Sequence, residues 1–276
     1  MFTLNCKGKL LTIDQPKVMG ILNLTPDSFY SGSRFTNTDL VLKETEIMLS
    51  EGAFIIDIGG QSTRPGSERI SPDEELKRVI PAIASITTRF PEAIISIDTY
   101  QAKVAKEAVN TGASIINDIS SGDMDEDMIK TVAALPVPYI CMHMKGTPAT
   151  MQQNPVYDDV ATAVLDYFIY KIARCKEAGI HDIIIDPGFG FGKTIQHNFQ
   201  LLKKMETLKQ LNKPILAGLS RKSTIYKTLG ITVEEALNGT TALNMIALLN
   251  GASILRVHDV KEAVETIRLF QAYQSA

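Results

Sequence analysis

Eight short apolar runs, each seven residues long, constrain the fold of this chain more than any other feature. They are rich in β-branched residues, and longer segments with helical periodicity separate them, which is the pattern of parallel βαβ units. Eight such units favour a closed barrel over an open sheet, so we predict a (β/α)8 TIM barrel of the α/β class. The runs are residues 18–24, 53–59, 93–99, 113–119, 137–143, 181–187, 214–220 and 252–258.

The segments between the runs have the pattern of amphipathic helices. In residues 155–178, one apolar stripe repeats every three or four residues, formed by Val160, Val164, Phe168, Ile172 and Cys175. Four segments end in a glycine before the next run, as expected for left-handed helix C-caps, namely Gly52, Gly112, Gly179 and Gly251. Ahead of the first run, residues 2–14 predict a small N-terminal β-hairpin.

Length and composition limit what such a barrel could be. A chain of 276 residues with 45% hydrophobic content can form one large core, so residues 1–276 are predicted to be a single domain. A net charge of -3 argues against nucleic acid as a partner. Neither a membrane span nor a signal-peptide core is visible, so we expect a cytoplasmic protein. The three cysteines form no CxxC pair and are expected to be free, mostly buried thiols.

Polar and charged residues recur at the ends of the apolar runs. A charge near the end of a covered parallel strand is costly unless it is solvated or paired in a cleft. In TIM barrels such clefts lie at the C-terminal face, where active sites are found. Each residue could instead tie neighbouring loops together, but their recurrence favours a site. The strand-end residues are Asn23, Asp57, Asp98, Asn117, Asp118, His143, Asp186, Ser220, Arg221, Lys222, Ser223, Arg256 and His258.

These residues divide into two chemical sets. Asp98, Asn117 and Asp186 are rich in hydrogen-bond acceptors and suit a planar ligand with a row of N–H donors. Arg64, Arg256, His258 and the turn that begins at Asn23 suit an anion, most plausibly a phosphate that shares its charge with a divalent cation. The two sets together predict a heterocyclic substrate that carries phosphate.

The glycine-rich segment 188–194 invites comparison with nucleotide-binding loops. It lacks the leading glycine of a P-loop, because Pro187 stands at that position, and its GxGxG spacing differs from the dinucleotide fingerprint. It could place a phenylalanine over a ligand or be a purely structural turn. His181 and His197 are expected to be surface or capping residues. The long polar loops 25–36 and 62–70 are expected to be lids or substrate clamps, with tolerated insertion as the alternative.

Eight strings of the sequence resemble the dihydropteroate synthases, which join a dihydropterin to p-aminobenzoate in folate biosynthesis. They occur in the family's order and span almost the whole chain, and they are MGILNLTPDSF (19–29), IIDIGGQSTRPG (55–66), ISIDTY (95–100), IINDIS (115–120), MHMKGTP (142–148), DPGFGFGK (186–193), GLSRKS (218–223) and ILRVHDV (254–260). The resemblance implies a transferase that takes 6-hydroxymethyl-7,8-dihydropterin pyrophosphate, uses magnesium and forms a homodimer. It also implies sulfonamide binding, although sensitivity cannot be read from the sequence.

The resemblance assigns a role to each matching position. The pterin ring is held by Asp98, Asn117, Asp186 and Lys222. The pyrophosphate is held by Asn23, Thr63, Arg64, Arg256 and His258, with Asn23 as the magnesium ligand and Asp57 in support. The p-aminobenzoate site is formed by Pro65, Phe191 and Ser223. Catalysis is expected to depend on Asn23, Asp98, Lys222, Arg256 and His258, through departure of the pyrophosphate before the amine attacks.

Two departures from the family pattern and two rival interpretations accompany this resemblance. Gln61 stands where many members carry Glu, and Tyr30–Ser33 differs from the more acidic and glycine-rich sequence that is commoner at this point of the first loop. Both departures lie beside the anion site and are expected to tune the affinity for substrate. The first rival is a methyltetrahydrofolate methyltransferase, which would bind the pterin ring with the same acceptor residues but needs no pyrophosphate-binding residues. A non-catalytic barrel is the second rival, and intact candidates for every role argue against it.

Overall fold

Eight parallel strands form one closed barrel in the computed structural model, which describes residues 1–24, 37–62, 69–151, 153 and 155–276. The order in the sheet is β8-β7-β6-β5-β4-β3-β10-β9, and a parallel bridge between Ile185 and Ile215 joins its two edges. The predicted (β/α)8 barrel is therefore confirmed. The strands are β3 (Lys17–Asn23), β4 (Ile55–Gly59), β5 (Ile94–Asp98), β6 (Ile115–Asp118), β7 (Tyr139–Met142), β8 (Ile183–Asp186), β9 (Leu216–Ala217) and β10 (Ile254–Val257).

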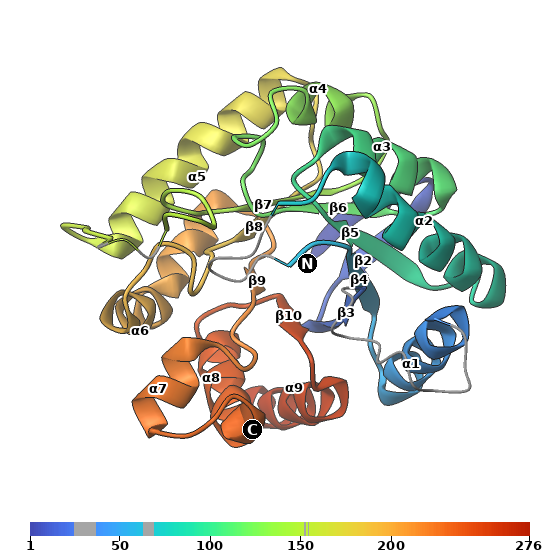
Figure 1. The fold of residues 1–276 in the computed structure, drawn as a ribbon. Coiled ribbons are helices and arrows are strands. Elements are labelled where there is room, and N and C mark those ends of the chain that lie inside the picture. Colours follow the sequence, from blue (N-terminus) through green and yellow to red (C-terminus); the bar gives the residue numbers. More distant parts are fainter. Residues whose placement is uncertain (25–36, 63–68, 152, 154) are drawn as a thin grey trace.

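The helices lie on the outside of the strands (Figure 1). They alternate with the strands along the chain, as the periodicity predicts, and two 3-10 helices, η2 (Met205–Leu211) and η3 (Glu234–Ala236), supplement them. The α-helices are α1 (Asn37–Glu51), α2 (Pro72–Arg89), α3 (Ala102–Thr111), α4 (Met128–Ala133), α5 (Val160–Glu177), α6 (Ile195–Lys203), α7 (Ser223–Leu229), α8 (Leu237–Leu249) and α9 (Val260–Gln274).

The predicted helix ends follow from local chemistry. Ser71 accepts a hydrogen bond from the backbone N–H of Glu74 at the start of α2, where Pro72 supplies a fixed φ and needs no donor partner. The four predicted C-cap glycines all have positive φ, from 92° at Gly179 to 148° at Gly112, so each chain reversal uses a conformation that side chains disfavour. His197 caps the start of α6 together with Thr194, which confirms its capping role.

One end of the barrel interior is filled by apolar side chains and closed by the N-terminal hairpin. The hairpin pairs β1 (Phe2–Cys6) with β2 (Lys9–Ile13), as predicted, and turns at Lys7 and Gly8 with positive φ. Its buried side chains, Leu4, Cys6, Leu11 and Ile13, share a cluster with the first inward-facing residue of seven barrel strands. Those residues are Met19, Ile55, Ile115, Ile140, Ile184, Leu216 and Ile254.

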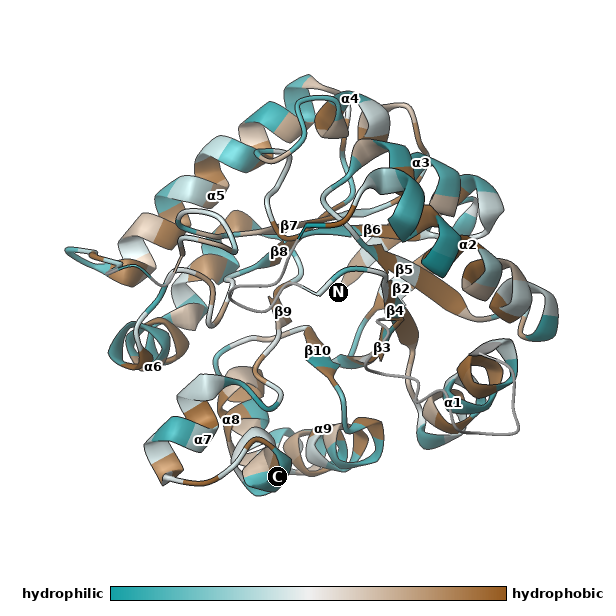
Figure 2. Cartoon of the chain, in the orientation of Figure 1, coloured by the Kyte–Doolittle hydropathy of each residue, from teal (hydrophilic) through white to brown (hydrophobic). Residues whose placement is uncertain are grey.

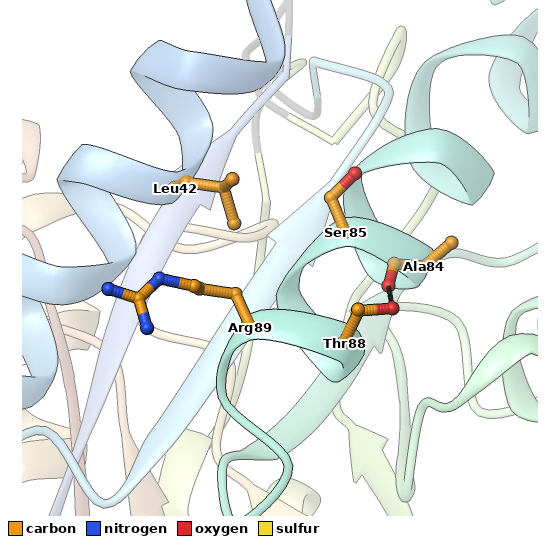
Figure 3. A pocket seen from close by; sticks show the side chains of 5 residues that line it. All are labelled: Leu42, Ala84, Ser85, Thr88 and Arg89. Carbon is orange, nitrogen blue, oxygen red and sulfur yellow. Dashed lines mark hydrogen bonds between the residues drawn. The ribbon is translucent and has the colours of Figure 1, made fainter.

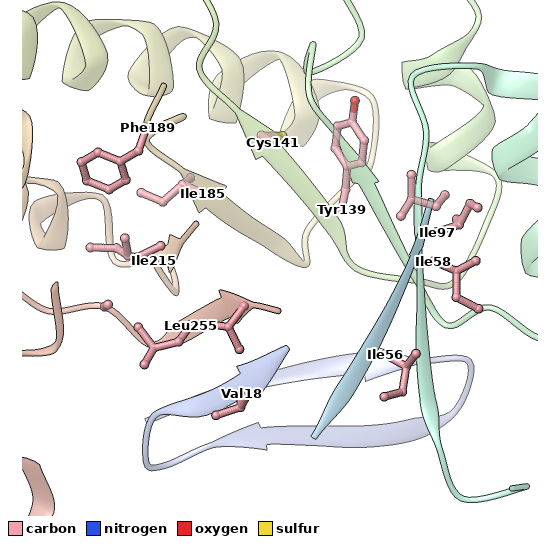
Figure 4. Packing of buried hydrophobic residues seen from close by; sticks show 14 of the residues in the cluster. Val18, Ile56, Ile58, Ile97, Tyr139, Cys141, Ile185, Phe189, Ile215 and Leu255 are labelled. Atoms are coloured by element: carbon pink, nitrogen blue, oxygen red, sulfur yellow. The ribbon is translucent and has the colours of Figure 1, made fainter. Parts of the chain in front are cut away.

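The larger core lies between the outer face of the strands and the helices (Figure 4). Ile56 and Ile58 of β4 alternate with the inward residues of that strand and are fully buried, as the two-residue period of a strand requires. On the helix side, the predicted stripe of α5 is buried along its whole length. Figure 2 shows the hydrophobic strands inside and the more hydrophilic helix faces outside. All three cysteines are free and buried, as predicted.

None of the helices in the described part of the chain is long and apolar enough to cross a bilayer.

Candidate functional site

Polar side chains occupy the interior of the barrel toward the C-terminal ends of the strands. Side chains two residues apart on a strand share a face. The buried interior isoleucines of β4, β6, β8 and β10 are therefore followed on the same face by Asp57, Asn117, Asp186 and Arg256. Asp98 lies on the interior face of β5 by the same rule. Five of the predicted strand-end residues thus lie on the interior face near the mouth of the barrel. Asp118, in contrast, lies on the opposite face of β6 from Asn117 and accepts a hydrogen bond of 2.7 Å from the Tyr139 hydroxyl.

Arg256 joins two of these carboxylates. Its Nε donates to Asp57 Oδ2 at 2.6 Å, and its Nη2 donates to Asp98 Oδ2 at 2.5 Å. Asp57 Oδ2 also accepts a hydrogen bond of 3.1 Å from Asn117 Nδ2. The sequence placed Asp98 and Arg256 in separate ring and anion sets, whereas the structure shows that the two sets share this ion pair. Nη1 of Arg256 donates to none of the described residues.

Three acceptor oxygens near this ion pair have no hydrogen-bond partner among the described residues: Asp98 Oδ1, Asn117 Oδ1 and Asp186 Oδ2. None of them is among the buried, unpartnered side-chain atoms of the described chain. Asp186 Oδ1, in contrast, accepts from the backbone N–H of Gly188 at 2.7 Å. The site therefore presents a row of open acceptors, as a donor-rich ring would require.

Lys222 supplies a cation beside these acceptors. Its Nζ donates to the carbonyl of Phe189 and lies 4.8 Å from the centroid of the Phe191 ring. Lys222 Nζ and Asp186 Oδ2 both lie about 4 Å from the point where a Cβ on Gly218 would stand, at 3.8 and 4.0 Å. Gly218 therefore keeps the space between ammonium and carboxylate free of side-chain atoms.

Burial shifts the ionisation of the groups at the mouth. It raises the pKa of Asp98 to about 7, although the Arg256 guanidinium opposes the shift. It also raises the pKa of Asp186, against the effect of Lys222. Burial lowers the pKa of Lys222 to about 8, and Asp186 limits that shift. Shifted values of both signs in one cleft are typical of a binding or catalytic site.

Asn23, Ser223 and His258 surround this centre. Asn23 ends β3, and its Oδ1 lies 3.6 Å from the point where a Cβ on Gly59 would stand, close to the Asp98 carboxylate, which is 3.9 Å from the same point. Ser223 begins α7 directly after Lys222. His258 follows β10, and its Nδ1 lies 3.0 Å from the Ser220 hydroxyl, which also accepts from the backbone N–H of His258. The sequence marks Ser220 as a strand-end residue but assigns it no role, which the bond to His258 supplies.

Several predicted residues lie outside the described part of the chain. Thr63, Arg64 and Pro65 belong to the second long loop, and Tyr30–Ser33 belong to the first. Gln61 is described, and its Oε1 accepts a hydrogen bond of 3.4 Å from the backbone N–H of Ile70.

A buried pair that sequence reasoning did not connect lies beside the site. Lys193 Nζ is 2.9 Å from His143 Nδ1, although the two residues are fifty positions apart. The sequence marks His143 as a strand-end residue and Lys193 as part of the glycine-rich segment, but no sequence pattern brings them together. Their proximity depends on β7 and β8 being neighbours in the sheet.

A separate hollow of about 490 Å³ lies on the outer surface between α1 and α2 (Figure 3). It is lined by Leu42, Ala84, Ser85, Thr88 and Arg89. None of these residues belongs to the predicted site, and the hollow opens on the helical layer rather than on the mouth of the barrel. The chemistry described above therefore lies elsewhere.

Known proteins match this chain over nearly its full length. Residues 19–258 match the family of pterin binding enzymes. Dihydropteroate synthase of Escherichia coli K12 is 46% identical over 272 residues, which cover 98% of this chain and 96% of that protein. The structure of Yersinia pestis dihydropteroate synthase with a sulfonamide drug has a TM-score of 0.94, 42% identity and 100% coverage of both chains. Dihydropteroate synthase from Xanthomonas albilineans, solved with 7,8-dihydropteroate, has a TM-score of 0.90, 38% identity and 99% coverage of both. The chain therefore belongs to the pterin-binding enzymes and, among them, to the dihydropteroate synthase family.

Proposed function

We propose that this protein is a dihydropteroate synthase. It joins 6-hydroxymethyl-7,8-dihydropterin pyrophosphate to p-aminobenzoate and releases 7,8-dihydropteroate and pyrophosphate. The observation that carries this proposal is the row of open acceptors on Asp98, Asn117 and Asp186, placed beside the cations of Lys222 and Arg256. Relatives that are 46% identical over 98% of the chain support the same activity.

The pterin ring is bound by the open acceptors and by Lys222. Ionised carboxylates only accept hydrogen bonds, so Asp98 and Asp186 face the N–H groups of the ring. Lys222 donates to an acceptor of the ring, and Asn117 Oδ1 completes the acceptor row. The interior position of these groups fixes the ring deep in the barrel, where the low dielectric strengthens each contact.

The pyrophosphate is bound at the rim by Asn23, Thr63, Arg64, Arg256 and His258. Arg256 is held by Asp57 and Asp98 through Nε and Nη2, so its free Nη1 is aimed by two fixed bonds. A guanidinium held in this way stabilises charge on a phosphate oxygen without reorganising during the reaction. Asp57 acts in support, because it contacts Arg256 and Asn117 and is fully buried.

Magnesium is the cofactor that this site fits. Among the described residues no cluster of three or more His, Cys, Asp or Glu side chains could cage a metal. Mg²⁺ is commonly held by one or two protein oxygens together with substrate phosphates and water. Asn23 offers such an oxygen, and its side chain makes no hydrogen bond to another described residue. When bound, the ion neutralises phosphate charge and so makes pyrophosphate a better leaving group.

The substitution is dissociative. The bond between the methylene carbon and the pyrophosphate oxygen breaks, and its electron pair leaves with the pyrophosphate. Asp98 and Asp186 favour the positive charge that spreads into the pterin. The lone pair of the p-aminobenzoate nitrogen then forms the new C–N bond, and an amine proton passes to water. Phe191, Pro65 and Ser223 hold the aromatic amine, with Ser223 at its carboxylate.

A homodimer in the cytoplasm is the proposed setting. Among the exposed large apolar side chains, Ile246 and Leu249 lie one turn apart on α8, and Leu269 and Tyr273 lie one turn apart on the neighbouring helix α9. Adjacent exposed apolar side chains on neighbouring helices are typical of a protein interface. Three free buried thiols fit a reducing compartment.

The proposed activity is tested with the purified protein, the pterin pyrophosphate, p-aminobenzoate and Mg²⁺, and dihydropteroate is detected by its mass. Absence of product together with tight binding of methyltetrahydrofolate would replace the proposal with a methyltransferase function. The dissociative step is tested by positional isotope exchange within the pyrophosphate in the absence of p-aminobenzoate. Complete lack of exchange would argue for direct displacement.

A further inference from the structure

Lys193 is a buried lysine whose described contacts are all with protein groups, and burial lowers the pKa of its side chain well below the ordinary value, against the effect of Asp186. Its residue is 3% exposed, and its Nζ donates to the carbonyls of Gly188 at 2.8 Å and Phe191 at 3.1 Å. The same Nζ lies 2.9 Å from Nδ1 of His143 and 3.4 Å from the His143 carbonyl. Nζ of Lys193 therefore connects the end of β7 to the glycine-rich turn that follows β8.

His143 is built to accept this bond. Burial, assisted by the neighbouring Lys193, lowers the pKa of His143 to about 2, so the ring is neutral and Nδ1 can accept. The ring packs edge-on against Tyr167, with centroids 4.9 Å apart. Because this packing fixes the ring, the acceptor toward Lys193 has one orientation.

The turn depends on ties of this kind, because its own backbone is unusual. Gly188, Gly190 and Gly192 all have positive φ, at 69°, 85° and 63°. A Cβ on Gly188 would stand 1.9 Å from the carbonyl oxygen of His143, which shows how closely the turn packs on β7. Three glycines in one turn carry a high entropic cost of ordering. Contacts from outside the turn must offset that cost.

The two phenylalanines of the turn are held in different ways. Phe189 is fully buried in the main core, so its own side chain fixes the carbonyl that binds Lys222. Phe191 is only half-buried, and it packs at the mouth of the barrel near Tyr100, Ile119 and Met142. Its backbone is held by the bond from Lys193 to its carbonyl and by its own N–H, which donates to the carbonyl of Gly188 at 3.1 Å.

We propose that Lys193 is a positioning residue for the p-aminobenzoate site: its buried Nζ, bound to His143 and to the carbonyls of Gly188 and Phe191, holds the turn so that the Phe191 ring faces the amine. The proposal rests on the proposed function for the identity of the ligand. Lys193 touches neither substrate. Its loss moves Phe191 while Phe189 keeps Lys222 in place, so the two substrates respond differently.

The test replaces the ammonium by a methyl thioether of similar length in Lys193→Met. The KM for p-aminobenzoate is expected to rise by at least about fivefold more than the dissociation constant of the pterin pyrophosphate, because small displacements of a positioning group are costly. Lys171→Met is the matched control, since Lys171 is an equally buried lysine that donates to Ser121 and Asp123. It should lower stability and leave the KM for p-aminobenzoate unchanged.

A second pair of variants covers failure of Lys193→Met to fold. His143→Asn keeps an acceptor near the position of Nδ1 and should retain the KM for p-aminobenzoate, whereas His143→Leu removes the acceptor and should raise it. The proposal is overturned if KM and the pterin dissociation constant change by similar factors. It is equally overturned if Lys171→Met reproduces the effect, or if His143→Asn behaves like His143→Leu.

Hydrogen exchange separates this inference from the proposed function. In the protein without ligands, the amides of Gly190–Gly192 should exchange faster in Lys193→Met than in the wild type and in Lys171→Met. If wild-type protein forms no dihydropteroate, the proposed function fails, and the exchange result alone decides whether Lys193 holds the turn. Unchanged exchange of these amides would show that it does not.

Discussion

Asp57→Asn tests whether the carboxylate pair around Arg256 orients the guanidinium. Asp57 is fully buried, and its Oδ2 accepts from Arg256 Nε at 2.6 Å and from Asn117 Nδ2 at 3.1 Å. The amide oxygen of asparagine can keep both bonds. The new NH2 group, however, would occupy the place of Oδ1, which is buried and has no partner among the described residues.

Two costs follow from this change. The ion pair with Arg256 becomes a hydrogen bond to a neutral acceptor, which removes about 1 to 1.5 kcal/mol, and an unsatisfied buried donor costs about 1 to 3 kcal/mol. Arg256 keeps its ion pair with Asp98, so the total penalty should be smaller than that of removing every partner of a buried charge, where the loss of one partner alone costs roughly 3 to 5 kcal/mol. We expect a loss of about 2 to 4 kcal/mol in the free energy of unfolding, measured by urea denaturation.

Asp57→Asn should lower activity by more than the loss of folded protein alone would explain. A guanidinium held by one carboxylate and one neutral amide oxygen, instead of by two carboxylates, is held less tightly and samples more orientations. The kcat/KM for the pterin pyrophosphate should therefore fall by about 10- to 100-fold, or roughly 1.4 to 2.8 kcal/mol. Asp73→Asn is the control, because Asp73 pairs with Lys103 on the surface, where both side chains are mostly exposed. It should change neither quantity measurably.

A double-mutant cycle decides between orientation and a general loss of structure. In an Arg256→Lys background, Asp57→Asn should have little further effect on kcat/KM, because the fork that Asp57 orients is absent. The reasoning is refuted if the full effect persists in that background, or if Asp57→Asn destabilises the protein and leaves kcat/KM at the wild-type value.

Three further predictions concern the core, the pH profile and assembly. Phe168→Ala should cost about 3 to 5 kcal/mol in urea denaturation, because its side chain is fully buried on α5, whereas exposed Tyr170→Ala should change stability by less than about 0.5 kcal/mol. Burial lowers the pKa of Lys222 to about 8, so kcat/KM for the pterin pyrophosphate should fall above that pH, and Lys222→Arg should remove the fall. The unfolded chain keeps this proton up to about pH 10.4, so stability linked to Lys222 should rise between the two values. Ile246→Asp combined with Leu249→Asp should give a monomer by sedimentation, and an unchanged dimer would place the interface elsewhere.

The fold could be predicted because each strand is marked locally. Apolar β-branched runs, a two-residue period and C-cap glycines such as Gly52 and Gly251 are properties of short segments, and the structure reproduces all eight strands in order. The run at 214–220 is shorter than predicted, since regular pairing in β9 covers only Leu216 and Ala217.

The contacts within the site could not be predicted in the same way. Whether Arg256 reaches Asp57 or Asp98 depends on the register of β10, β3, β4 and β5 around the barrel, which no local pattern specifies. For the same reason the bond between Lys193 and His143 could not be predicted, although the sequence marks each residue separately. A lysine directly after a glycine-rich turn, with a strand-end histidine nearby in the fold, is the signal to search for in other barrels.

The N-terminal hairpin has a consequence for the order of events. The hairpin closes the N-terminal end of the barrel, because its buried side chains Leu4, Cys6, Leu11 and Ile13 pack against the interior residues there. Both reactants must then enter, and both products must depart, through a single opening. Under the proposed function, the pterin binds at Asp186, at the end of β8, and the amine binds at Phe191, in the turn that follows that strand. The proposed sites thus predict that the pterin pyrophosphate binds before p-aminobenzoate.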